Sequence, residues 1–549
     1  MNKITFERDE KPRVIAPELH SQFIEFLGGC IDGGIWVGKD SEIPNYDGIR
    51  KDVVDALAEI QPPVVRWPGG CYADMYHWRD GVGPERKQTW NTNFTTWAPE
   101  KNEFGTHEFM NFCKRIGAKP WININMLSGT TEEMADWAEY CNREEETDLS
   151  KERAENGSPE PFGVEYWGIG NEVWAGGGNY TAQGYVNEYR RYAGAMPRFS
   201  HMEMSEDADG RMHPQMKGTP TKLIASGPDG NKPLERVRWT KDVFKALGEY
   251  RMPQIWGYDL HFYNWNMKQM EPETVFGPED WYRVIYGAME LEDVIKEQDA
   301  LMQEGLAAIP PEEGGAFGPG DRKREVKMVV GEWGNWHGSA FVNQPSLWQQ
   351  CTMRDAITTA ITMDIFHRNC DIVGMACAAQ TVNVLNSILL TDGEKTIRTP
   401  NYYVTKMYMP HRGATALSLS DESEFKAACV DTEVTVPEIY PFASEKDGII
   451  TVNLVNAAYD QDAEVELTLP GTLEAADPID GSGSDKCLRY LCGEVLTAED
   501  PHDVNDAADP SRVVPVPAEG AAVPVLMDGK RTFHVTIPAA SVCVYQFQE

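Results

Sequence analysis

Two glutamates follow apolar runs that are typical of buried strands, and each lies beside further polar or aromatic residues. Glu172 closes the stretch VEYWGIGNE (Val164–Glu172), directly after Asn171, and Glu332 lies within VVGEWGNWH. Two facing carboxylates can act as nucleophile and general acid/base, and in retaining glycosidases they lie about 5–5.5 Å apart. The sequence therefore predicts Glu172 and Glu332 as a catalytic carboxylate pair.

The same kind of position, at or near the end of an apolar strand, is predicted for several other polar side chains. They are Glu25, Arg66, His261, Tyr263 and Gln380. Asn171 is expected to hydrogen-bond a hydroxyl next to the reacting carbon, and Gly176–Gly178 are expected to let the next loop pass close to a substrate. His261 with the two glutamates could ligate a metal, but the H-x-x-x-H spacing is missing, so no metal or cofactor is expected.

These residues need a scaffold that brings distant parts of the chain together. Eight apolar runs alternate with amphipathic, helix-like segments, which predicts a closed parallel (β/α)8 TIM barrel with its site at the carboxyl ends of the strands. An open doubly wound sheet is the alternative, but no Gly-rich phosphate turn follows the first run. The runs are Phe23–Gly29, Pro63–Gly70, Lys119–Met126, Val164–Glu172, Lys222–Pro228, Ile255–Tyr263, Val326–Gly334 and Ile372–Gln380.

The pattern changes to period-two alternation after about residue 390, with Pro-, Gly- and Asp-rich turns between the segments. This pattern is typical of an antiparallel β-sandwich. We predict an N-terminal strand in residues 1–18 that completes the sandwich, a catalytic barrel in 19–390 and the sandwich, jelly-roll-like, in 391–549. No aromatic row stands out on the sandwich strands, so its expected role is to brace the barrel.

Composition restricts the partners and the compartment. The chain has 549 residues and a net charge of −36, which disfavours nucleic acid and anionic membranes as partners. The N-terminus lacks the apolar segment of a secretory signal, and no apolar run is long enough to span a membrane. Eleven scattered Cys do not form a disulfide framework, so a cytoplasmic location is expected.

Six motifs occur together in one order: FIEFLGGCIDGGIW, RWPGGCYADMYHWRDGVGP, NEFGTHEFM, WGIGNE, GEWGNW and AAQTVNVLNSI. In these motifs the chain resembles the α-L-arabinofuranosidases of glycoside hydrolase family 51 over nearly its whole length. The resemblance implies a retaining mechanism, with Glu172 as acid/base and Glu332 as nucleophile. It also implies a sugar subsite formed by Glu25, Arg66, Asn171, His261, Tyr263, Trp336 and Gln380.

Two further substrate-binding positions carry features of their own. Many family members have Asn where this chain has Cys71, although some carry Cys, and Trp97 is expected as a lid or subsite platform. The loop around Trp174 departs from the commonest family version and bears on the aglycone side. The resemblance also suggests a homo-hexamer.

The leading functional hypothesis is an exo-acting α-L-arabinofuranosidase that removes terminal residues from short oligosaccharides, such as fragments of arabinan or arabinoxylan. A β-xylosidase or an endo-β-glucanase on the same barrel is the alternative within hydrolases. A non-catalytic carbohydrate-binding barrel is disfavoured, because a binder needs no carboxylate pair. A barrel isomerase or aldolase would need a catalytic Lys, a phosphate loop or metal ligands, and none is predicted at a strand end.

Overall fold

The computed structural model describes residues 1–206, 211–268, 270–310, 325–421, 423–430, 435–470, 488–518, 523–527 and 530–548. Its backbone contacts divide the chain into two compact units. One unit comprises 1–20, 263–294 and 333–549, and the other comprises 21–262 and 295–332. These units are not the predicted domains, so the boundaries at residues 18 and 390 stay a prediction.

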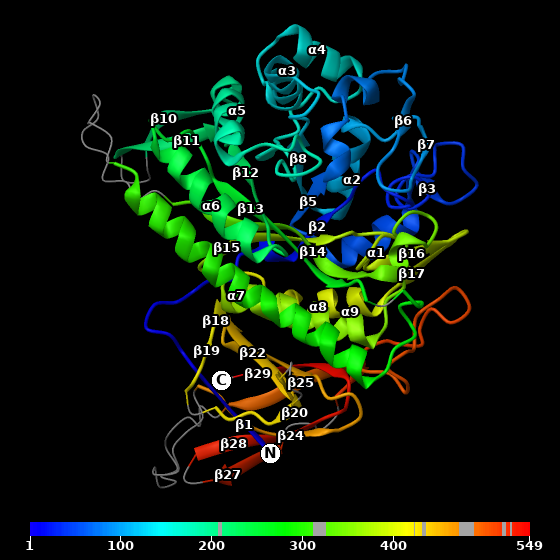
Figure 1. Ribbon diagram of the computed structural model, residues 1–549, viewed down its shortest axis with the longest axis vertical. Helices are drawn as coiled ribbons and strands as arrows, with labels where there is room; N and C mark the ends of the chain where they lie inside the picture. The colour runs from blue at the N-terminus through cyan, green and yellow to red at the C-terminus, as the bar shows by residue number, and fades with distance from the viewer. Residues whose placement is uncertain are drawn as a thin grey trace. The chain divides into compact units, whose positions relative to one another are not determined.

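Eight strands form a closed barrel in which strands adjacent in the sequence are also neighbours in the ring (Figure 1). Five of the pairings between its neighbouring strands are parallel, which agrees with the predicted (β/α)8 architecture. Its members are β2 (Ser21–Phe23), β5 (Val64–Trp67), β8 (Lys119–Ile124), β9 (Tyr166–Ile169), β12 (Lys222–Asp229), β13 (Gly257–Asn266), β14 (Lys327–His337) and β15 (Val373–Ala379).

Helices follow the strands along the chain, and their ends carry the expected signals. Thr130 caps α3 by accepting a hydrogen bond from the Glu133 amide, at 3.0 Å, and Gly117 ends α2 in the left-handed conformation. The helices are α1 (Lys51–Ile60), α2 (Thr106–Ile116), α3 (Thr131–Asn142), α4 (Asp148–Glu155), α5 (Ala182–Ala195), α6 (Pro233–Gly248), α7 (Pro278–Ala308), α8 (Met353–Arg368) and α9 (Pro400–Met407).

Two further sheets form the predicted sandwich around a shared apolar core, which includes Ile4 and Val465 from one sheet and Val452 and Tyr545 from the other. The first sheet has the order β19 (Ser418–Leu419), β1 (Asn2–Glu7), β24 (Ala463–Thr468), β28 (Lys530–Ile537) and β27 (Val523–Met527). The second has the order β18 (Thr415–Ala416), β22 (Ile439–Lys446), β23 (Ile449–Asn456), β29 (Ser541–Gln548), β25 (Arg489–Leu496) and β26 (Val516–Pro517).

The N-terminal strand joins this sandwich, as the sequence predicts. Strand β1 pairs antiparallel with β19 on one side and in parallel with β24, beside which it lies in Figure 1, on the other. A strand from the far end of the chain is not held by a hairpin turn, so either direction is open to it.

Five two-stranded hairpins complete the described strands: β3 (Asn45–Tyr46) with β4 (Ile49–Arg50), β6 (Thr89–Asn91) with β7 (Ala98–Glu100), β10 (Ser200–Glu206) with β11 (Met212–Gly218), β16 (Leu389–Asp392) with β17 (Lys395–Arg398), and β20 (Ala427–Val430) with β21 (Thr435–Pro437).

Among the residues with described positions, no helix combines the length and the apolar character needed to cross a bilayer.

Candidate active site

Glu332 lies inside a barrel strand rather than at its end. The prediction ended the seventh strand near this residue, but the strand continues as β14 to His337. Arg66, on β5, is fully buried and donates from Nη1 to Glu332 Oε1 at 2.7 Å and from Nη2 to Asn171 Oδ1 at 2.7 Å. A charge-assisted hydrogen bond of this kind holds the Glu332 carboxylate in one place.

Glu172 lies beyond the end of its strand. Strand β9 ends at Ile169, and Glu172 occupies the following turn with a φ of 38°, where few non-glycine residues are found. Its side chain is 23% exposed and its Oε1 lies 3.0 Å from His261 Nδ1. Burial, and then the charge of Glu332, raise the pKa of Glu172, while His261 acts in the opposite direction. The raised pKa favours the protonated form of Glu172, which suits a general acid.

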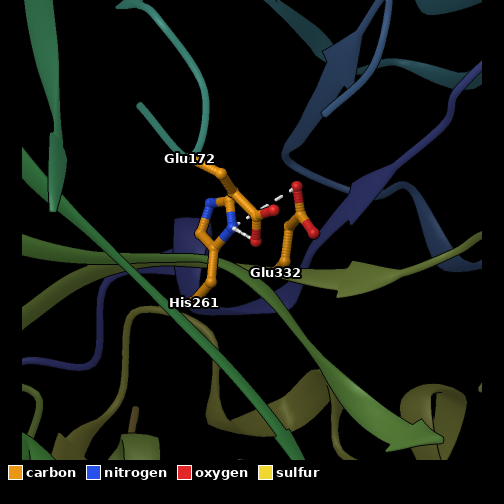
Figure 2. Close-up of side chains that lie close together, drawn as sticks. All are labelled: Glu172, His261 and Glu332. Atoms are coloured by element: carbon orange, nitrogen blue, oxygen red, sulfur yellow. Dashed lines mark hydrogen bonds and ion pairs between the residues drawn. The ribbon is translucent and has the colours of Figure 1, made fainter. Parts of the chain in front are cut away.

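The His261 ring faces the carboxyl groups of both glutamates, and Figure 2 shows the three side chains together. Its Nδ1 is 3.0 Å from Glu172 Oε1 and 3.5 Å from Glu332 Oε1. Burial alone would lower the pKa of His261, but the carboxylates of Glu332 and Asp259 outweigh it and raise this pKa to about 10. The ring is therefore an imidazolium near neutral pH, and both of its nitrogens donate.

One carboxylate oxygen of Glu172, one of Glu332 and one ring nitrogen of His261 all lie within 4.8 Å of one another. Inverting glycosidases separate their two carboxyl groups by about 6.5–9.5 Å to admit a water molecule, whereas retaining enzymes need about 5–5.5 Å. The short separation matches the retaining arrangement. The same three groups could surround a metal ion, but a doubly protonated imidazole has no lone pair to give, and Arg66 already neutralises Glu332. The donor set thus suits proton transfer better.

At two positions around the site only glycine leaves enough room for the neighbouring atoms. A Cβ on Gly70, in the turn after β5, would lie 2.5 Å from Glu332 Oε1. A Cβ on Gly177 would lie 1.8 Å from the Asn171 carbonyl oxygen, so this glycine is required by the turn that presents Asn171 and Glu172. The glycine-rich loop was predicted to leave room for substrate, but at Gly177 the close neighbour is the backbone of the protein itself.

Asn171 has an unused donor. It is 1% exposed, its Oδ1 is occupied by Arg66, and its Nδ2 is buried without a hydrogen-bond partner within the described part of the chain. Buried donors without partners are rare and costly. A hydroxyl of a bound sugar would satisfy this one.

Two more predicted residues, Glu25 and Cys71, are affected by the charges of the glutamate pair. Glu25 is 3% exposed and accepts hydrogen bonds from the Tyr72 amide at 2.8 Å and from Asn93 Nδ2 at 2.9 Å. Burial and then Glu332 raise the pKa of Glu25 to about 7. Cys71 begins a 3-10 helix (Cys71–Asp74), and burial, followed by Glu172, raises the pKa of its thiol well above the usual value, which disfavours the thiolate form.

The remaining predicted residues are placed as follows. The Trp97 side chain is 64% exposed on the turn between β6 and β7, and its Nε1 donates to the Phe94 carbonyl oxygen at 3.1 Å. Tyr263, Trp336 and Gln380 belong to the other compact unit, where all three are buried. The rings of Tyr263 and Trp336 pack edge to face there, with centroids 5.1 Å apart.

Sequence reasoning missed two buried carboxylates, Asp74 and Asp259, which are each 5% exposed. Asp259 precedes His261 by two residues on the same strand, so both side chains lie on one face, and this i, i+2 spacing in YDLHFY was the available signal. For Asp74 no local pattern exists. Its Oδ1 is buried with no hydrogen-bond partner among the residues that the structure describes, and burial, followed by Glu172, raises its pKa from 3.8 to about 8.

This shift predicts a pH dependence of stability. Between about pH 4 and pH 8 the folded protein keeps a proton on Asp74 that the unfolded chain has released, so stability falls as pH rises through this window. An Asp74→Asn variant removes this term, which is worth a few kcal/mol in order of magnitude. We expect the fall in Tm between about pH 5 and about pH 8.5 to be smaller in the variant than in the wild type. Equal falls in calorimetry would show that Asp74 is ionised in the fold.

The barrel and its closely spaced carboxylates define a retaining glycoside hydrolase. A model described as the α-L-arabinofuranosidase 1 domain matches residues 56–280, and one for the α-L-arabinofuranosidase C-terminal domain matches 331–541. An intracellular exo-α-L-arabinofuranosidase of Bacteroides ovatus is 34% identical over 99% of this chain and 95% of its own length. The chain belongs to the α-L-arabinofuranosidases of glycoside hydrolase family 51, which confirms the resemblance in the sequence.

Solved structures agree with this assignment. The crystal structure of the family 51 arabinofuranosidase from Xanthomonas axonopodis pv. citri has a TM-score of 0.83 at 32% identity and covers 100% of both chains. The arabinose complex of the Thermotoga maritima α-L-arabinofuranosidase has a TM-score of 0.77 at 25% identity, also over 100% of both chains. The likeness therefore extends over barrel and sandwich together.

Proposed function

We propose that the chain is an exo-acting α-L-arabinofuranosidase, with Glu332 as nucleophile and Glu172 as acid/base. The observation that supports these roles is that one oxygen of each carboxylate lies within 4.8 Å of the other, with Arg66 bound to Glu332 and a raised pKa on Glu172. Membership of the family supports the substrate, since the Bacteroides ovatus relative is named an exo-α-L-arabinofuranosidase.

In the first step, an oxygen of the Glu332 carboxylate attacks the anomeric carbon and the glycosidic bond breaks. The leaving oxygen takes the proton of Glu172, and an arabinosyl ester forms on Glu332. The Nδ1–H of His261, 3.0 Å from Glu172 Oε1, stabilises the carboxylate that appears on Glu172 as the proton leaves.

In the second step, Glu172 acts as a base. Burial still raises the pKa of Glu172, but the ester on Glu332 carries no charge, so the contribution of the Glu332 charge to this rise is gone and the carboxylate form of Glu172 is more favoured than before. Glu172 takes a proton from water, the oxygen of that water attacks the anomeric carbon, and Glu332 leaves as a carboxylate. Two displacements give overall retention.

The next part of the proposal concerns which residues bind the sugar and which substrates the protein acts on. The unused Nδ2 of Asn171 and the buried carboxyl of Glu25 are suited to sugar hydroxyls. The substrates proposed are short oligosaccharides, since the Bacteroides ovatus relative is named intracellular. A cytoplasmic location, substrates from arabinan or arabinoxylan, and a hexameric assembly remain predictions.

Substrate preference is tested with p-nitrophenyl α-L-arabinofuranoside, β-D-xyloside, β-D-glucoside and β-D-galactofuranoside. We expect kcat/KM for the arabinofuranoside to exceed the others by about 100-fold or more, because a pocket built for a sugar's hydroxyls rejects analogues that leave buried polar groups unpaired. NMR of the first-formed anomer should show retention. A preference for the xyloside or the glucoside would favour the alternative hydrolases, and no turnover by a folded protein would favour a binding role.

A further inference from the structure

Asp259 contacts both the His261 ring and the peptide that precedes Glu332. It lies on β13, two residues before His261, and is 5% exposed. Its Oδ2 accepts a hydrogen bond from His261 Nε2 at 3.1 Å, and its Oδ1 accepts one from the Gly331 amide at 2.7 Å. One carboxylate therefore holds both the imidazole that faces the two glutamates and the peptide directly before Glu332.

The fit around this carboxylate is close. A Cβ on Gly331 would lie 2.3 Å from Asp259 Oδ1 and 2.6 Å from Oδ2, so the contact needs a glycine immediately before Glu332. The residue before the proposed nucleophile is thus adapted to Asp259. A chance contact between neighbouring strands would not need this match.

We propose that Asp259 is a positioning residue for the reaction: it orients His261 so that Nδ1–H faces Glu172, and it holds Glu332 in place through the Gly331 amide. This proposal rests on the roles proposed for Glu172 and Glu332. His261 then acts as a fixed cation whose hydrogen bond strengthens as negative charge develops on Glu172. Asp259 itself touches no substrate.

Replacing Asp259 by Asn tests the proposal, because the amide keeps the shape but offers one acceptor oxygen to two N–H donors. Either Gly331 or His261 loses its acceptor. If the amide nitrogen faces Nε2, the imidazole loses a negatively charged partner, so the pKa of His261 falls and the ring becomes neutral at a lower pH than in the wild type. Because the His261 charge lowers the pKa of Glu172, its loss raises that pKa further.

The expected kinetic result is specific. For aryl arabinofuranosides with poor leaving groups, kcat/KM of Asp259→Asn should fall about 10- to 100-fold, a part of the ~10²–10⁴-fold that acid–base catalysis supplies. Good leaving groups need less protonation and should lose less. The basic limb of the kcat/KM profile should move to higher pH, since Glu172 keeps its proton longer. The other charged or titratable groups that face the Glu172–His261 pair are Glu332, Asp259, Asp229, Asp74 and Cys71.

Glu165→Gln is the control. Glu165 directly precedes β9, pairs with Lys119 at 2.8 Å and with Lys222 at 3.0 Å, and makes no contact with the Glu172–His261 pair within the described part of the chain. This variant should keep kcat/KM within about twofold for both classes of leaving group, with no shift of the basic limb to higher pH. An unchanged limb and an equal loss on good and poor leaving groups in Asp259→Asn would overturn the proposal.

A second measurement does not depend on the variant folding. Nitrogen-15 NMR of histidine-labelled wild type should show His261 protonated on both ring nitrogens at about pH 7.5. A neutral ring at that pH would also overturn the proposal. An inactive wild type would instead contradict the proposed function, whereas an active wild type with an unaffected Asp259→Asn variant would contradict this inference alone.

Discussion

Glu332→Gln is expected to lower kcat on aryl α-L-arabinofuranosides by about 10⁴-fold or more, because no other group can form the glycosyl ester. This corresponds to about 5.5 kcal/mol of lost transition-state stabilisation. The amide oxygen can still accept from Arg66, which now donates to Glu332 Oε1 at 2.7 Å, so the fold should survive. Steady-state kinetics and circular dichroism of the purified variant measure both effects.

The matched control for this variant is Glu165→Gln. Glu165 directly precedes β9 and pairs with Lys119 and Lys222, at 2.8 Å and 3.0 Å, away from the catalytic cluster. Its loss should leave kcat within about twofold. If Glu332→Gln retained more than about 1% of wild-type kcat in a preparation free of wild-type enzyme, another residue would have to be the nucleophile.

Glu172→Ala is expected to have an effect that depends on the leaving group. For poor leaving groups, kcat/KM should fall by about 10²–10⁴-fold, since the leaving oxygen no longer receives a proton. For dinitrophenolate, which leaves without a proton, the first step should be nearly unaffected and the glycosyl-enzyme should accumulate because water is not activated. A linear plot of log kcat/KM against leaving-group pKa, steeper than for the wild type, is the measurement.

Azide distinguishes the two roles. In Glu172→Ala, azide can replace water at the ester and should give a glycosyl azide of retained configuration. In Glu332→Ala, azide would replace the nucleophile itself and give the inverted azide. Equal losses on good and poor leaving groups, with no rescue in Glu172→Ala, would contradict the assignment. Glu165→Ala, treated in the same way, should form no azide adduct beyond the wild-type level.

Much of the barrel could be predicted because its strands are buried on both faces and therefore read as apolar runs. The strand limits were less accessible. The run Phe23–Gly29 was predicted as a strand, but β2 is Ser21–Phe23, since residues beyond it stay buried in turns. Apolar character reports burial, and a buried turn carries the same signal as a buried strand. Glu172 and Glu332 were found because each follows such a run, although neither ends its strand.

Contacts that depend on three dimensions were beyond sequence reasoning. The hydrogen bond from Gly331 to Asp259 joins two strands that are 72 positions apart, and nothing local predicts it. The same holds for the buried Oδ1 of Asp74, whose environment depends on the closing of the barrel. The sequence marks Gly177 as part of a glycine-rich loop, but the Asn171 carbonyl oxygen that requires a glycine at this position is near it only in the folded turn.

The central claim is that Glu332 carries the sugar between the two displacements. Mass spectrometry of Glu172→Ala, quenched in acid after reaction with dinitrophenyl α-L-arabinofuranoside, tests it most directly, because the ester is formed in this variant but hydrolysed slowly. The account predicts one arabinosyl group per chain, located after digestion on the peptide that contains Glu332. An arabinosyl group on Glu25, Asp74 or any other residue, or no adduct while dinitrophenolate is released in a burst, would contradict it.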